Sequence, residues 1–155
     1  MSFERRLQEL GVQLPVAPKP VANYIPAVLS GDLLFLSGVL PSKDGQVLVA
    51  GKVDRDVTVE QGKEAARQAL LNALAIVRAE VGSLDRVRKV VRLTGYVASA
   101  QGFTQQPAVI NGASDLLVEL FGEAGRHARV AVGAAELPLN ASVELELIVQ
   151  VVPAK

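Results

Sequence analysis

Residues 129–144 read Arg129-Val-Ala-Val-Gly-Ala-Ala-Glu-Leu-Pro-Leu-Asn-Ala-Ser-Val-Glu144, and they indicate the architecture of the C-terminal region. Arg129 opens an apolar run, where a guanidinium without a partner is costly to bury. Residues 137–140 read as a turn, and the strand after them has Glu144 as its first acidic residue. The pattern predicts two antiparallel strands that bear a cation and a carboxylate. This pair has two interpretations: a site for an anionic substrate beside a proton-transfer group, or an ion pair that only ties two strands together.

The composition excludes several kinds of site. The chain has 155 residues, a length typical of one domain, and its 16 Lys and Arg residues balance 16 Asp and Glu residues. A chain without net charge lacks the basic surface of a dedicated nucleic-acid-binding protein. The absence of cysteine excludes disulfides, thiolate metal sites and a cysteine nucleophile, and the one histidine, His127, cannot build a multi-histidine metal site. We expect His127 to face solvent in a loop.

Two features predict where the protein resides. The N-terminus has no apolar run after its charged residues, so it does not look like a signal peptide. No stretch of about 18 apolar residues occurs, which is the minimum for a membrane-spanning helix. We therefore expect a cytoplasmic protein that does not contact membranes.

Helical signals mark three segments: residues 2–10, 58–82 and 107–121. Ser2 suits the N-cap of the first, and Pro107 suits the first turn of the third. Thr58 and Gln61 form a capping-box pattern at the start of the second, and Gly82 ends it. Apolar side chains recur at helical spacing in both long segments, so each is predicted to pack one face on a core. Between the first helix and the strands, a proline-rich segment over residues 14–20 is predicted to be an extended arm.

Strands are predicted at residues 23–28, 33–37, 46–49, 90–97, around 129–132 and at 142–152. The last one alternates cleanly, so its apolar residues share one face and Glu144 and Glu146 share the other. Helices and strands do not alternate strictly along the chain, which favours an α+β fold with both long helices on one sheet face. Apolar residues nevertheless occur on both faces of the late strands, for example Val130, Val132 and Ile148. A sheet with two apolar faces needs a second cover, so we expect an oligomer.

Three polar residues have both a structural and a functional interpretation. Tyr24 either packs half-buried beside Pro26 or covers a pocket with its hydroxyl available. Ser37 either bonds to nearby backbone at a strand end or lines a site. Asn111, inside the third helix, is either a surface amide or a site residue.

Several motifs, in order and at matching distances, resemble the RidA/YjgF family of reactive intermediate deaminases, also labelled L-PSP endoribonucleases. The motif that carries the resemblance is Arg129-Val-Ala-Val132, followed by Leu137-Pro138 and Val143-Glu144-Leu-Glu146. Upstream, Asn23-Tyr24-Ile25-Pro26 is similar to the family's Gly-Pro-Tyr segment, and Phe35-Leu-Ser37-Gly38-Val-Leu-Pro41 to its Ser-Gly-Gln-Ile/Leu-Pro strand end. Asn111 falls near an asparagine of the family's second helix, with one extra residue between it and Arg129. The chain looks like a divergent branch, because Ala131 stands where the family often has a cysteine and Asn23 replaces a proline.

The resemblance implies a fold and an assembly. The fold is α+β, of the YjgF/chorismate mutase-like kind: a mixed six-stranded sheet with two long helices packed on one face, plus the short N-terminal helix. One domain would span residues 1–155, with residues 1–15 as an N-terminal extension. Three copies would form a homotrimer around a central barrel, with a cleft between each pair of subunits.

The resemblance also implies a reaction, the hydrolytic deamination of reactive 2-imino or enamine acids to 2-oxo acids and ammonia, similar to a 2-iminobutanoate/2-iminopropanoate deaminase. No cofactor or metal is needed. Arg129 would grip the substrate carboxylate, and Glu144 would deprotonate or orient the attacking water. The cleft residues would be Tyr24, Ser37, Gly38, Asn111 and Ala131. One alternative is a trimeric protein that binds small carboxylate metabolites without catalysis, and another is an endoribonuclease, which the neutral charge and the single histidine argue against.

Overall fold

The structure, a computed structural model, describes residues 1–20 and 22–153. Its helices are α1 (Phe3–Glu9), α2 (Val59–Val81) and α3 (Gln106–Phe121). Its strands are β1 (Ala27–Ser30), β2 (Leu33–Leu36), β3 (Ser42–Lys43), β4 (Gln46–Val47), β5 (Val87–Ala98), β6 (Ala128–Ala134) and β7 (Val143–Val151). Three 3-10 turns complete the described chain: η1 (Leu84–Arg86), η2 (Gly122–Gly125) and η3 (Pro138–Asn140).

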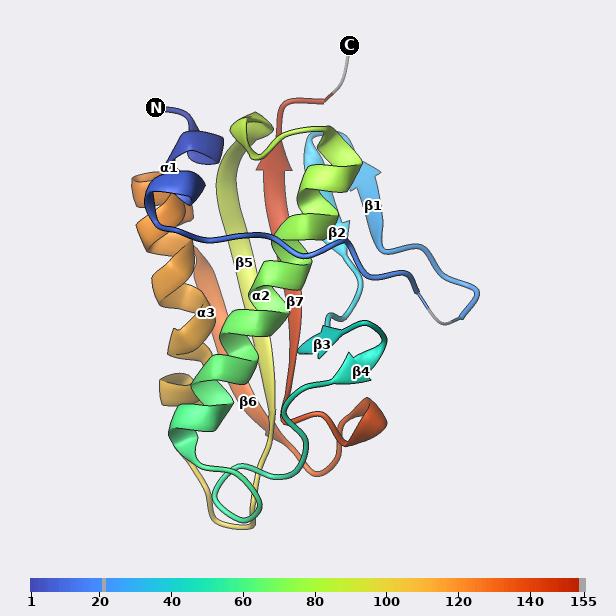
Figure 1. The fold of residues 1–155 in the computed structure, drawn as a ribbon, viewed down its shortest axis with the longest axis vertical. Helices are drawn as coiled ribbons and strands as arrows, with labels where there is room; N and C mark the ends of the chain where they lie inside the picture. The colour runs from blue at the N-terminus through green and yellow to red at the C-terminus, as the bar shows by residue number, and fades with distance from the viewer. Residues whose placement is uncertain (21, 154–155) are drawn as a thin grey trace.

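The main sheet has the strand order β1-β2-β7-β5-β6, and only β5 and β6 run parallel to each other. Both long helices cover one face of this mixed sheet, which confirms the predicted α+β architecture (Figure 1). The sheet has five strands where six were expected, because β3 and β4 pair with each other in a separate hairpin. The first strand also begins later than predicted, at Ala27, and continues to the turn at Gly31.

The two strands of the Arg129–Glu144 stretch do not pair, so the interpretation as an ion pair that only ties two strands together is wrong. β5 lies between β6 and β7: Arg129 of β6 is opposite Leu93, whereas Glu144 of β7 is opposite Tyr96. The reason is topological. A parallel β5–β6 pair needs a crossover, which α3 provides, and the crossover places β6 at the outer edge of β5. The other edge of β5 is then free for β7, which runs antiparallel to it.

The helix termini agree with the sequence signals. The Thr58 side chain and the Gln61 side chain form the reciprocal capping box, and Gly82 ends α2 in the left-handed region with φ 87°. Ser2 caps α1 by accepting a hydrogen bond from the backbone N–H of Arg5 at 3.1 Å. The arm after α1 then crosses over α2 toward the β1–β2 side of the molecule (Figure 1).

The core lies between the sheet and the two long helices. Alternate residues of β7, from Val143 to Val151, are buried there, as the alternation predicts. The helices approach each other closely at Gly112 of α3, where a Cβ atom would overlap the backbone carbonyl of Lys63 in α2. This close crossing places the adjoining face of α3 beside the edge strand β6.

The opposite face of the sheet is open and partly apolar. Val28, Phe35 and Val132 are 51%, 40% and 42% exposed, and Ile148 is half-buried opposite Phe35. This confirms that apolar side chains occupy both sheet faces. Across the described residues, no helix is long and apolar enough to span a membrane.

Candidate functional site

Arg129 is organised by α3, the helix that precedes its strand. Its register with the buried Leu93 directs its side chain toward the helix-covered face, at the edge of the sheet. The guanidinium Nη1 donates to Asn111 Oδ1 at 2.7 Å and to Ser114 Oγ at 3.2 Å. Asn111 is exposed, which agrees with its interpretation as a surface amide, and its side-chain oxygen also accepts a hydrogen bond from Arg129.

The guanidinium keeps one edge unused. Two hydrogen bonds occupy the two N–H groups of Nη1, and within residues 1–20 and 22–153 no acceptor lies within hydrogen-bond distance of Nε or Nη2. In the same part of the chain no carboxylate forms an ion pair with Arg129. The free Nε–Nη2 edge has the fork geometry that binds a carboxylate with two parallel hydrogen bonds. A half-buried cation without an internal counter-ion is thus ready to bind an anion.

Two residues beside Arg129 were not predicted as site residues. Ser114 Oγ lies 3.0 Å from Nε2 of His127, and Nδ1 of His127 lies 2.6 Å from the backbone oxygen of Gly125. The expectation that His127 faces solvent is wrong, because the ring is half-buried and bonded through both nitrogens. The helical spacing held a signal for Ser114: it lies three residues after Asn111, so the two side chains share one helix face.

Glu144 belongs to the other sheet face, beside the end of β2. Gly38 follows β2, and a Cβ atom there would overlap the Glu144 carboxylate. The absence of a side chain at Gly38 therefore leaves space for this carboxylate. Burial raises the pKa of Glu144, and the charge of Glu146 on the same face raises it further. Glu146 itself accepts a 2.7 Å hydrogen bond from the Tyr96 hydroxyl.

A cavity of about 600 Å³ is lined by Gly38, the residue that adjoins the Glu144 carboxylate. Three predicted cleft residues line it: Tyr24, which is 48% exposed, Ser37 and Gly38. The Ser37 hydroxyl donates to the backbone oxygen of Ile25 at 2.7 Å, so the structural interpretation of this serine is correct, and its lone pairs remain available. The arm at residues 15–20 forms another wall of the cavity, and the apolar side chains of Val39 and Ile76 contribute to its lining.

The predicted site residues therefore form two groups in one chain. The Arg129 group contains Asn111, and Ala131 points to the same sheet face two residues along β6. The Glu144 group contains Tyr24, Ser37 and Gly38, on the other side of β5. Among the described residues, no hydrogen bond or ion pair joins the two groups.

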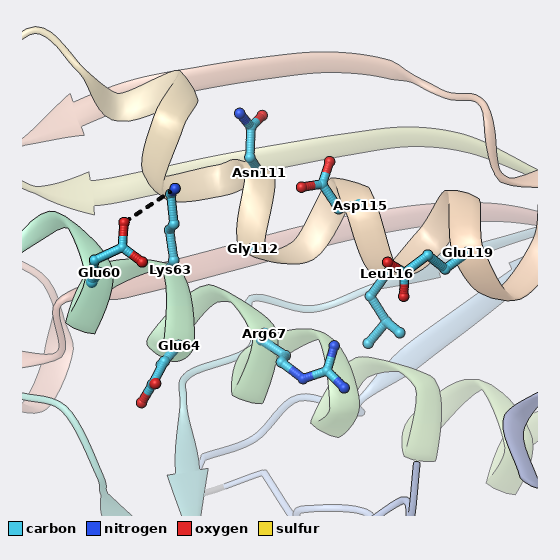
Figure 2. A pocket seen from close by; sticks show the side chains of 9 residues that line it. All are labelled: Glu60, Lys63, Glu64, Arg67, Asn111, Gly112, Asp115, Leu116 and Glu119. Carbon is cyan, nitrogen blue, oxygen red and sulfur yellow. Dashed lines mark ion pairs between the residues drawn. The ribbon is translucent and has the colours of Figure 1, made fainter. Parts of the chain in front are cut away.

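A second hollow, of about 240 Å³, lies between α2 and α3 (Figure 2). It is lined by two cations and four carboxylates, namely Lys63, Arg67, Glu60, Glu64, Asp115 and Glu119. Lys63 already pairs with Glu60 at 3.3 Å, and Asn111 at the rim points away from α2 in Figure 2. An excess of carboxylates disfavours an anionic ligand, so this hollow does not extend the Arg129 group.

Comparisons with known proteins place the chain in a family and match its fold. Residues 4–151 match a family described as "YjgF/chorismate mutase-like, putative endoribonuclease". A 2-iminobutanoate/2-iminopropanoate deaminase of Dermatophagoides farinae is 32% identical over 139 residues, which cover 89% of this chain and 93% of that protein. A crystal structure of an Agrobacterium tumefaciens protein of unknown function is 50% identical, with a TM-score of 0.90 over 97% of this chain and 92% of that one. The structure of Escherichia coli TdcF with bound serine is 25% identical, with a TM-score of 0.63 over 86% and 92% of the two chains. The chain belongs to the YjgF/chorismate mutase-like family.

Proposed function

We propose that this protein hydrolyses reactive 2-imino and enamine acids to 2-oxo acids and ammonia. The observation that carries the proposal is the half-buried Arg129 guanidinium, whose Nε–Nη2 edge has no partner among the residues that the structure describes. A 2-imino acid has a carboxylate next to the reacting carbon, so this edge would hold the substrate in one orientation. Two relatives support the proposal: one is named as an imine deaminase, and the other was crystallised with serine, an amino acid with the same carboxylate.

The reaction would take place between subunits of a homotrimer. Arg129 and Glu144 lie on different faces of one sheet, so a complete site requires that a second copy bring its Glu144 group to the Arg129 group. The open sheet face supports this assembly, because Val28, Phe35 and Val132 need a cover. A closed ring of three copies, which the family resemblance implies, would use both groups of every chain.

Glu144 would then act on water. Water oxygen adds to the imine carbon while Glu144 takes one water proton, and Glu144 then gives this proton to the imine nitrogen, which becomes an amine. The hydroxyl proton of this intermediate then moves to the amine, again through Glu144. The carbon–nitrogen bond breaks as the carbonyl forms, and ammonia and the 2-oxo acid are released. The raised pKa of Glu144 suits this exchange, since a carboxyl that titrates nearer neutrality both accepts and returns a proton.

The cavity beneath the arm would receive the substrate side chain. It lies beside Ser37 and Gly38, and its volume of about 600 Å³ exceeds what a methyl or ethyl group needs. Prolines of the arm and the side chains of Val39 and Ile76 make much of its wall apolar. We therefore expect a preference for 2-imino acids with bulky apolar side chains.

A non-catalytic carboxylate-binding protein is the second candidate. One observation favours it: the Arg129 group is complete within a single chain, whereas Glu144 belongs to another region. Such a protein would bind 2-oxo acids and amino acids through Arg129 without releasing ammonia. An endoribonuclease is not proposed, because both nitrogens of the one histidine are already bonded.

The test is an imine-hydrolysis assay. An amino-acid oxidase generates 2-imino acids from short and bulky amino acids, and semicarbazide competes for the imine. We expect wild type to accelerate imine loss, Arg129→Ala to reduce kcat/KM by about a hundredfold or more, and Arg129→Lys to retain part of the activity. Binding of 2-oxo acids without acceleration by a folded wild type would reject the deaminase and support the binding protein.

A further inference from the structure

We propose that Ser114 and His127 are positioning residues that hold the Arg129 guanidinium in its ligand-binding orientation. The inference rests on the proposed function in one respect, namely that Arg129 binds the substrate carboxylate. Neither residue touches that carboxylate in this arrangement. Both act through the Nη1 group of Arg129.

The hydrogen bonds run in one direction along this chain of residues. A carbonyl oxygen only accepts, so the 2.6 Å contact with Gly125 places a proton on Nδ1 of His127. In the neutral ring Nε2 is then an acceptor, and the Ser114 hydroxyl donates to it at 3.0 Å. The Ser114 oxygen in turn accepts from Arg129 Nη1 at 3.2 Å. The backbone of η2 therefore orients the ring, the ring orients the hydroxyl, and the hydroxyl orients the guanidinium.

This arrangement restricts a side chain that otherwise has many rotamers. Asn111 alone would leave the guanidinium able to swing about one hydrogen bond, whereas a second acceptor on Nη1 defines its plane. With both Nη1 protons engaged, the Nε–Nη2 edge points to the ligand and no rotamer search is needed on binding.

The chemistry of the supports also matters. Asn111 and Ser114 are uncharged, so they orient the guanidinium without neutralising it. A carboxylate in their place would form an ion pair and compete with the substrate carboxylate for the same charge. The half-buried His127 ring supplies the acceptor that Ser114 needs without adding negative charge.

Substrate kinetics test this role by removing and restoring the hydroxyl. We expect Ser114→Ala to raise KM about tenfold while kcat stays within about twofold, because looser positioning weakens carboxylate binding in ground and transition state alike. Ser114→Thr keeps the hydroxyl and should restore KM to within about threefold of wild type, and His127→Leu should act like Ser114→Ala. Ser83→Ala, which removes a cap at η1, is the control for a general loss of stability.

Two further measurements do not depend on catalysis. Nitrogen NMR of the one histidine should show a neutral ring protonated at Nδ1, with an Nε2 resonance that moves in Ser114→Ala. Calorimetry with 2-oxobutanoate should show about a tenfold weaker Kd for Ser114→Ala than for wild type. If wild type binds 2-oxobutanoate but does not turn over imines, the deaminase proposal fails. The Kd comparison then still tests the positioning role of Ser114 and His127. Unchanged KM and Kd in a folded Ser114→Ala, or a ring protonated at Nε2, would overturn it.

Discussion

The two groups of candidate site residues differ in how far one chain completes them. Around Arg129, every polar neighbour has a partner: Asn111 and Ser114 bind the guanidinium, and His127 binds Ser114. Around Glu144 the carboxylate has no hydrogen-bond partner among the described residues, although it is half-buried and its pKa is raised. The first group is prepared to bind a ligand, whereas the second still lacks the groups that it would act on.

This difference has a physical meaning for the proposed reaction. A binding group gains affinity when it is rigid before the ligand arrives, because less conformational entropy is lost on binding. A proton-transfer group needs an unsatisfied position where water can sit, and a raised pKa is the usual sign of incomplete solvation. In the proposed reaction, the carboxylate would be bound by groups of one chain, whereas proton transfer would depend on the assembly.

The largest effect on activity is expected when an intact Arg129 group and an intact Glu144 group are supplied by different chains. Arg129→Ala and Glu144→Ala alone should each lose about a hundredfold or more in kcat/KM. Mixed oligomers made by refolding them together in equal amounts should recover about a quarter of wild-type activity, since a site needs an intact group from each of two neighbours. Oligomers mixed from wild type and the double variant are the control for refolding. An inactive mixture beside an active control would show that one chain supplies both groups.

A second prediction concerns the cavity next to the Glu144 group. Ala17 is half-buried on the arm and lines the cavity, so Ala17→Trp should fill part of it. We expect kcat/KM for bulky 2-imino acids to fall about tenfold while that for 2-iminopropanoate changes less than threefold, because only the longer side chains need the space. Gln13→Trp, an exposed change outside the cavity, controls for arm disturbance. Equal losses for both substrates would show that the cavity does not receive the side chain.

The smallest effect is expected on stability and comes from the raised pKa of Glu144. The folded carboxyl keeps its proton to a higher pH than the unfolded one, so stability falls as pH rises from the ordinary glutamate range through the raised pKa. Above that pKa the folded protein bears the full free-energy cost of the charged, half-buried carboxylate. Glu144→Gln should therefore raise Tm at pH 8, by about 2 °C, and the gain should vanish near pH 3.

Thermal unfolding at several pH values measures this gain. Glu64→Gln removes an exposed carboxylate from α2 and should leave Tm within about 1 °C at both pH values, since a surface charge contributes little. A Tm for Glu144→Gln below that of wild type at pH 8 would contradict the assignment of a burial cost to this carboxyl.

The sequence predicted the elements well where the signal is local. The capping box at Thr58, the glycine that ends α2 and the alternation of β7 all depend on residues a few positions apart, and the structure has each of them. The family resemblance assigned Tyr24, Ser37 and Gly38 to one cleft with Asn111 and Ala131. The structure brings the first three to one cavity and places the other two near Arg129 within the chain.

Interactions between distant segments were predicted less well. The alternation of β6 and β7 gives each strand a buried face, but it does not say which edge of β5 each strand takes. The interpretation of Arg129 and Glu144 as an ion pair between neighbouring strands was wrong for that reason. Ser114 was missed although it lies three residues after Asn111 on one helix face, and His127 was expected to face solvent because a single histidine shows no periodicity. Their importance follows only from the 3.0 Å contact that the packing of α3 against β6 creates.

By itself the sequence determined the α+β class, the helix termini, the two-faced sheet and the family, since short-range geometry and motif spacing specify all of these. Only the tertiary structure decided that β5 separates Arg129 from Glu144, that Ser114 and His127 support the guanidinium, and that the arm encloses a cavity. These features depend on which distant surfaces meet when the core is buried. The hydrophobic effect that drives this burial is non-directional, so the choice of partners lies in the packing of the whole chain.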